Sequence, residues 1–181
     1  MDIRHIDQID SAAWLAPSVQ KQVRKTNTAT AEVNAALDRV LKLREAARSA
    51  ILGGGTAKYC RSAVQDARDA SYNGLQAEIG QRHAMATTLE VIKADVVRAQ
   101  REAKQALEAA ESGATETMQR AGITRVLPIH VAQHADVEGA RKHYQQTKQW
   151  LQSVNAQART NHDRLGALHG LLEDKAKRLA V

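Results

Sequence analysis

The 181-residue sequence contains no phenylalanine and few aromatic residues of any kind. Its aromatic residues are Trp14, Tyr59, Tyr72, Tyr144 and Trp150. A thick globular core normally depends on such side chains, because each one that is buried removes roughly 150–250 Å² from water. Alanine supplies much of the 43% apolar content instead, and small side chains suit helices that pack along a thin seam. The composition therefore favours long helices over a thick core.

Cysteine is also scarce, since Cys60 is the single one. An intrachain disulfide is therefore excluded, which fits a reducing compartment. No run approaches the roughly 18 apolar residues of a membrane-spanning helix, and the start, MDIRHIDQID, lacks the apolar stretch of a secretory signal. We expect no membrane span and no cleavable signal peptide, and hence a location in the cytoplasm or inside an assembled particle such as a virion.

Acidic residues are outnumbered by basic ones, and the formal net charge is +6. Residues 122–181 hold nine basic and five acidic residues, whereas residues 56–121 hold nine of each. A smaller basic cluster in QKQVRK contains Lys21, Arg24 and Lys25. This excess mildly favours acidic partners, and the three residues are our candidates for non-specific contact with nucleic acid.

Apolar periodicity divides the chain into an N-terminal arm and three long helices. The arm, residues 1–28, is irregular apart from a short helix near Pro17, and KTNTAT at 25–30 reads as a break followed by a helix cap. The helices are expected at 29–52, 56–121 and 128–179, and they form one domain over 29–181. GGG at 53–55 separates the first two, and GITRVLPI, with Pro128 as a first-turn residue, separates the last two.

Two of these helices carry residues at alternating spacings of three and four, the repeat of a coiled coil. In the helix over 56–121 this seam contains Leu89, Ile92, Val96, Ala99, Ala103 and Ala106. In the helix over 128–179 it contains Val137, Tyr144, Leu151, Val154, Leu165, Leu168 and Leu172. The polar members of the second seam, among them Thr147 and Asn161, are expected to fix the register of the pairing at some cost in stability.

These patterns predict an all-α protein with the fold of an elongated antiparallel helical hairpin, or coiled coil, to which the helix over 29–52 adds a short third helix. The connections are short, which favours antiparallel neighbours. A thin hairpin buries little surface per residue, and alanine-rich seams allow further helices to approach closely. We therefore interpret the two seams as surfaces for self-association and expect a homo-oligomer or a subunit of a larger assembly.

The segment HVAQH places His130 and His134 one helical turn apart, a spacing that zinc ligands use. A zincin has glutamate directly after the first histidine, and Val131 stands there instead. Glu138 lies about 12 Å farther along the helix axis, too far for one metal ion to bind all three. The two histidines are weak metal candidates, and we expect them to pack at the tip of the hairpin.

The segment GGGTAK at 53–58 places glycines and a lysine before a helix, as phosphate-binding loops do. It lacks the P-loop spacing and a preceding strand, so a hairpin turn is the better interpretation. No activating partner lies near Cys60 in the sequence, which favours a small packed side chain. The sequence predicts no enzyme: no catalytic residue, no cofactor and no small-molecule substrate.

Three functional hypotheses follow from these observations. The first is a structural or assembly subunit (scaffold, stalk, adaptor or virion component) that acts through coiled-coil self-association. The second is a basic helical protein associated with nucleic acid. The third is a regulatory protein that lays a helix into a groove on a partner. The excess of arginine over lysine and the lack of phenylalanine hint at a GC-rich bacterial or phage genome.

Overall fold

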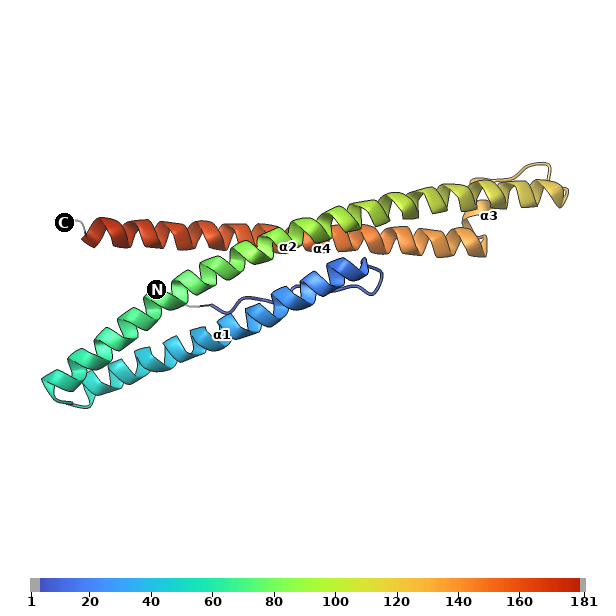
Figure 1. The fold of residues 1–181 in the computed structure, drawn as a ribbon. Helices are drawn as coiled ribbons and strands as arrows, with labels where there is room; N and C mark the ends of the chain where they lie inside the picture. The colour runs from blue at the N-terminus through green and yellow to red at the C-terminus, as the bar shows by residue number, and fades with distance from the viewer. Residues whose placement is uncertain (1–3, 180–181) are drawn as a thin grey trace. The chain divides into compact units, whose positions relative to one another are not determined.

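Four α-helices make up most of the chain in a computed structural model that describes the backbone of residues 4–179 and the side chains of residues 4–173. The helices are α1 (Pro17–Leu52), α2 (Ala57–Arg120), α3 (Pro128–Ala132) and α4 (Ala135–Leu179) (Figure 1). No strand occurs among the described residues. The all-α prediction is confirmed.

The chain divides into two compact units, and both α2 and α4 contribute to each of them. The first unit comprises the described residues of 1–89 and 158–181, and the second comprises residues 90–157. In the first unit α1 runs antiparallel to α2: Thr26 hydrogen-bonds to Thr88, whereas Thr30, one turn later in α1, bonds to Gln81, earlier in α2. On α2 of the same unit, Leu75 and Ile79 pack against Leu165 and Leu168 of α4.

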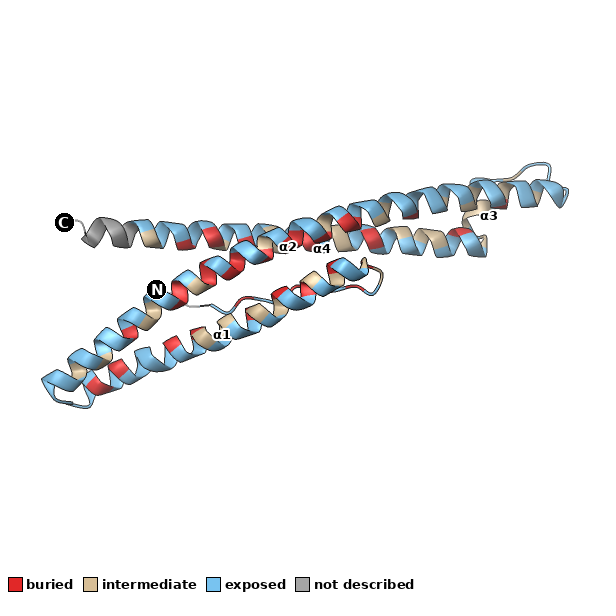
Figure 2. Ribbon diagram, viewed as in Figure 1, coloured by how far each residue is buried: buried red, intermediate tan, exposed pale blue. Residues whose placement is uncertain are grey.

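The second unit is a two-helix hairpin, in which residues 121–134 connect α2 to α4 (Figure 1). Arg141 of α4 forms an ion pair with Glu111 of α2, with 3.6 Å between Nη2 and Oε1. Buried residues form a stripe on each helix and include Ile92 and Val96 of α2 and Val137 of α4 (Figure 2). This unit has the antiparallel pairing that the heptads predict.

All seam residues predicted in α4 lie on its buried face. Val137, Val154, Leu165 and Leu168 are buried, and Tyr144, Leu151 and Leu172 are half-buried. In α2 the seam holds through Leu89, Ile92, Val96, Ala99 and Ala103, but Ala106 is exposed. Leu107 is half-buried in its place, and the inward positions continue at Ala110, Ala114 and Met118. The spacing becomes four, three, four and four because the larger Leu107 side chain faces inward, so the strict heptad ends at Ala103.

Helix α1 begins at Pro17, well before the start expected at residue 29. KTNTAT does not break the helix, because its threonine hydroxyls bond to carbonyls one turn earlier. Thr28 Oγ1 donates to Arg24 O at 3.1 Å, and Thr30 Oγ1 donates to Thr26 O at 2.9 Å. The short helix expected in the N-terminal arm is therefore the start of α1, with Pro17 in the first turn.

A single helix over 128–179 is also wrong, since α3 ends at Ala132 and α4 begins at Ala135. The N–H of Gln133 turns back to the carbonyls of Ile129 and His130, which closes α3. Asp136 and Glu138 lie in the first turn of α4. Acidic side chains stabilise a helix N-terminus, so they favour a new helix start here.

The turn between α1 and α2 matches the hairpin turn predicted from GGG. Gly54 has φ of 70°, a conformation that favours glycine, and Gly53 N donates to Ser49 O at 2.8 Å. Helix α2 then starts at Ala57, where Thr56 Oγ1 accepts a hydrogen bond from Tyr59 N at 3.3 Å. The glycines of GGGTAK thus belong to a turn that leads into a capped helix start, and Lys58 is the second residue of α2.

Candidate functional site

A cluster of charged side chains is buried between α2 and α4 in the first unit. Glu78 is fully buried, and its Oε1 accepts hydrogen bonds from Nε of Arg82 and Nε of Arg164, both at 3.0 Å. Arg82 Nη1 donates to Asn161 Oδ1 at 3.4 Å, and Asn161 Nδ2 donates to the carbonyl of Arg82 at 2.8 Å. Asn161 therefore ties one position of α4 to one position of α2, the register role predicted from its place in the seam.

These charged side chains help to join α2 to α4. One carboxylate is shared by two guanidinium groups, and each group is held by its neighbours. A buried cluster of this kind adds little net stability over an apolar core, but removing one partner leaves the others uncompensated. We interpret it as a register device, because the contacts of Arg164 with Glu78 and of Asn161 with Arg82 exist in one alignment of α2 and α4.

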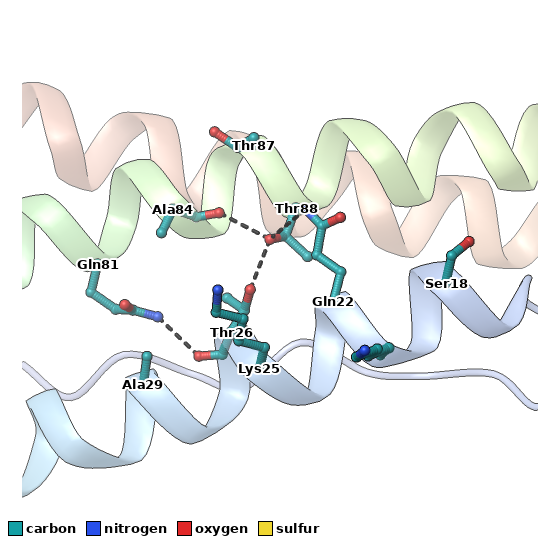
Figure 3. Close-up of a pocket in the computed structure, with 10 residues that line it drawn as sticks. Ser18, Gln22, Lys25, Thr26, Ala29, Gln81, Ala84, Thr87 and Thr88 are labelled. Atoms are coloured by element: carbon teal, nitrogen blue, oxygen red, sulfur yellow. Dashed lines mark hydrogen bonds between the residues drawn. The ribbon is translucent and has the colours of Figure 1, made fainter.

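A ladder of polar side chains joins α1 to α2 in the same unit (Figure 3). Thr88 Oγ1 lies 2.8 Å from Thr26 Oγ1, and Gln81 Nε2 donates to Thr26 O at 3.0 Å and to Thr30 Oγ1 at 2.9 Å. Gln22 Nε2 donates to Thr88 Oγ1 at 3.4 Å. The buried hydroxyls of Thr26, Thr30 and Thr88 all find partners, so polar side chains can take part in the pairing of α1 and α2 here.

A groove of about 710 Å³ runs beside this ladder, and two predicted nucleic-acid contacts line it (Figure 3). Lys21 and Lys25 stand one turn apart on α1, across from Thr87 of α2. Arg24 is exposed on the same stretch but does not line the groove. The structure therefore brings two of the three candidates together.

Large apolar side chains are exposed at the α1–α2 turn, by which we mean residues 53–56 and the helix ends on either side of them. Leu52 is 76% exposed, Tyr59 59% and Ile51 57%. Beside them lies a hollow of about 430 Å³, lined by Ala46, Ser49, Ala50, Gly53, Gly55 and Tyr59. An apolar projection thus stands next to a shallow depression on one end of the first unit. Neither the heptads nor the motifs pointed to this surface.

Another missed feature is the docked segment, residues 4–15, which lies along α1 (Figure 1). Its buried residues are Ile6, Ile9, Ala12 and Leu15. In the sequence, IDQIDSAAWL has an apolar residue at every third position, and this spacing fits neither an α-helix nor a β-strand. Asn27 and Asn34 of α1 hydrogen-bond to its backbone.

The predicted metal candidates do not form a site with other ligands. His130 is exposed on α3, and Nδ1 of His134 is buried 3.5 Å from Asp136 Oδ2. Within the described residues, no three histidine, cysteine or acidic side chains lie close enough to hold a metal ion. Cys60 is half-buried in the first turn of α2, with its Sγ 3.3 Å from Ala50 O of α1.

No helix in the described part of the chain has an apolar stretch long enough to cross a membrane. Comparisons with protein-family models, with curated proteins and with solved structures found no match for this chain.

Proposed function

We propose that this protein is a structural or assembly subunit that works by associating with further copies of itself. The predicted seams are covered by helices of the same chain, so association needs another surface. The apolar α1–α2 turn supplies one. Exposed Leu52 is the observation that carries the proposal, because large apolar groups clustered on a surface mark protein contacts.

A second copy is the occupant that fits this turn. The projection formed by Ile51 and Leu52 and the hollow that Tyr59 lines lie at the same end of the first unit. In a two-fold symmetric contact each copy offers the same patch, so a projection next to a depression is self-complementary. The projection of each copy would enter the hollow of the other.

Sedimentation of a Leu52→Ser variant tests this contact. A two-fold contact buries Leu52 of both copies, and each contributes about 1.5–3 kcal/mol, so self-association should weaken by roughly two to four orders of magnitude. Leu43→Ser is the matched control, since Leu43 is a 40% exposed leucine elsewhere on α1. A Leu52→Ser variant that associates as strongly as the Leu43→Ser control would contradict a contact at this turn. Capture of one stoichiometric foreign partner, without self-association, would favour the regulatory hypothesis.

A second candidate function, non-specific binding of nucleic acid, is supported by Lys21 and Lys25. The two ammonium groups border one groove, and among the described residues no carboxylate forms an ion pair with either of them. Binding to duplex DNA should weaken steeply with salt, and Lys21→Ala with Lys25→Ala should reduce the salt slope by about two. Lys104→Ala is the control, because Lys104 pairs with Glu108 at 3.6 Å. No binding at low salt would exclude this function.

A further inference from the structure

Two asparagines of α1 hold the backbone of the docked segment. Asn34 Oδ1 accepts from Ile6 N at 2.8 Å, and Asn34 Nδ2 donates to Ile6 O at 2.9 Å. Asn27 makes the same pair of bonds to Ile9 N and Ile9 O, both at 2.9 Å. A carboxamide offers one acceptor and a donor side by side, so each asparagine satisfies both polar groups of one residue. This contact recognises extended backbone, whatever side chain that residue carries.

The spacing of these contacts shows how the segment is stretched. Asn27 and Asn34 are two turns apart, about 10.5 Å along the helix. Three residues of the docked segment, from Ile6 to Ile9, cover that distance. This is about 3.5 Å per residue, so the segment is extended and not α-helical, where the rise is about 1.5 Å per residue. At the far end His5 Nε2 lies 2.8 Å from Asp38 Oδ1, one turn beyond Asn34.

Apolar side chains give the site its selectivity. Ile6, Ile9, Ala12 and Leu15 are buried, and Asp7 and Gln8 between them are exposed. An apolar residue at every third position is typical of an extended chain with three residues per turn. The α1 face therefore selects an extended segment with this pattern.

The connection between the docked segment and α1 is a short turn. Leu15 N donates to Ala12 O at 3.2 Å, and Gln20 Nε2 donates to Ala13 O at 2.9 Å and to Leu15 O at 2.7 Å. Ala16 is extended, with φ −54° and ψ 141°, as a residue before proline prefers. Opening this turn would release the docked segment while its own contact residues stay intact.

We propose that the face of α1 with Asn27 and Asn34 is a receptor site that accepts the docked segment of a second copy of this chain. Exchange between copies keeps every contact of the segment and changes only the turn, so it is an inexpensive route to a dimer. Each copy carries both the segment and the site, which makes the exchange reciprocal. Exchange rests on the assembly role proposed above, because it names a second copy as the partner, but it uses a surface other than the α1–α2 turn.

A disulfide trap across the His5–Asp38 contact tests the exchange without disturbing the apolar contacts. The variant carries His5→Cys and Asp38→Cys in a Cys60→Ser background, and isotope-labelled and unlabelled chains are mixed before oxidation. Mass spectrometry of the digest should find residues 5 and 38 linked between differently labelled chains, in a fraction that rises with protein concentration. Linked peptides of a single label at every concentration would overturn the exchange. His5→Cys with Glu32→Cys controls for random oxidation, since Glu32 is exposed elsewhere on α1.

A peptide of residues 4–15 tests the receptor site directly. It should bind the full chain carrying Ile6→Ser and Ile9→Ser, whose own segment no longer docks, and bind far less to the matched control with Asp7→Ser and Gln8→Ser. Adding Asn27→Ala to the first variant should weaken binding roughly 30-fold, because two hydrogen bonds are lost. Failure of the peptide to bind a variant with full helix content would overturn the receptor site. If that variant loses helix content, the disulfide trap decides alone.

The tests also separate this exchange from the contact at the α1–α2 turn. A peptide that binds while the trap yields only single-label links would overturn the second copy as the occupant. Mixed-label links in a Leu52→Ser background would support the exchange even if the turn contact fails. A dimer that depends on Leu52 but yields no mixed-label links would overturn the exchange and leave the proposed function standing.

Discussion

The Gly74→Ala substitution tests how closely α1 approaches α2. A Cβ at residue 74 would lie 2.9 Å from Cγ2 of Val40 and 3.4 Å from Cδ2 of Leu37, and both side chains are buried. Val40 has little room to respond, because a β-branched side chain has few rotamers. Gly80 lies in the same helix and is exposed, and a Cβ there meets nothing within 4 Å. Gly80→Ala is therefore a matched control.

The two substitutions share one energy term and differ in another. Alanine favours a helix over glycine by about 1 kcal/mol, and this gain is available at both positions. Overpacking costs about 1–3 kcal/mol and applies at residue 74 alone. Gly80→Ala should thus raise the free energy of unfolding by about 1 kcal/mol, while Gly74→Ala should leave it unchanged or lower it by up to about 2 kcal/mol.

Urea unfolding followed by circular dichroism measures both variants, and the m-value checks that the unfolding transition is comparable. Adding Val40→Ala to Gly74→Ala should remove the steric conflict, so the double variant should lose less stability than the sum of the two single changes. A Gly74→Ala variant stabilised as much as Gly80→Ala would refute the close approach of α1 and α2 at this position.

Three further predictions concern charged groups and metal. Glu78→Ala should lower the free energy of unfolding by about 3–5 kcal/mol, because Arg82 and Arg164 lose their shared partner, whereas Glu108→Ala, which breaks an exposed pair, should change it by at most about 0.5 kcal/mol in the same urea assay. A hydrogen bond from Lys142 and the positive charge of that lysine hold the pKa of the Glu138 carboxyl below its ordinary value. The ionised carboxylate therefore favours the folded state above the unfolded-state pKa, and this is lost as pH falls through the folded-state pKa; a titration by nuclear magnetic resonance should show the low pKa, and Lys142→Ala should raise it. A chelator should leave the melting temperature unchanged, since His130 is exposed on α3 and no three histidine, cysteine or acidic side chains among the described residues lie close enough to hold a metal ion; a zinc-dependent increase that His130→Ala abolishes would contradict this.

The fold was predictable where one spacing explained a whole helix. Two interleaved seven-residue series, one with Val137 and Leu172 and the other with Val154 and Leu168, place every predicted α4 position on the buried face. Prediction failed where tertiary contacts outweighed local preference. Thr26 and Thr30 read as a break because threonine is a poor helix former, yet they bond to Thr88 and Gln81, more than fifty residues away, and α1 continues through them.

The candidate surfaces were less predictable for a related reason. Lys21 and Lys25 were identifiable because their charges cluster in sequence, and the structure places both beside one groove. The partners of Glu78 were not, because Arg164 reaches it only when α2 pairs with α4 in one alignment. The docked segment was missed because a three-residue period belongs to neither a helix nor a strand, so its apolar residues counted as irregular.

The mass of the wild-type protein in solution tests the central claim, self-association, most directly. Sedimentation equilibrium over a wide range of concentrations should show reversible formation of a dimer or larger oligomer, with the helical circular dichroism signal unchanged throughout. A folded monomer at every concentration would contradict the assembly role.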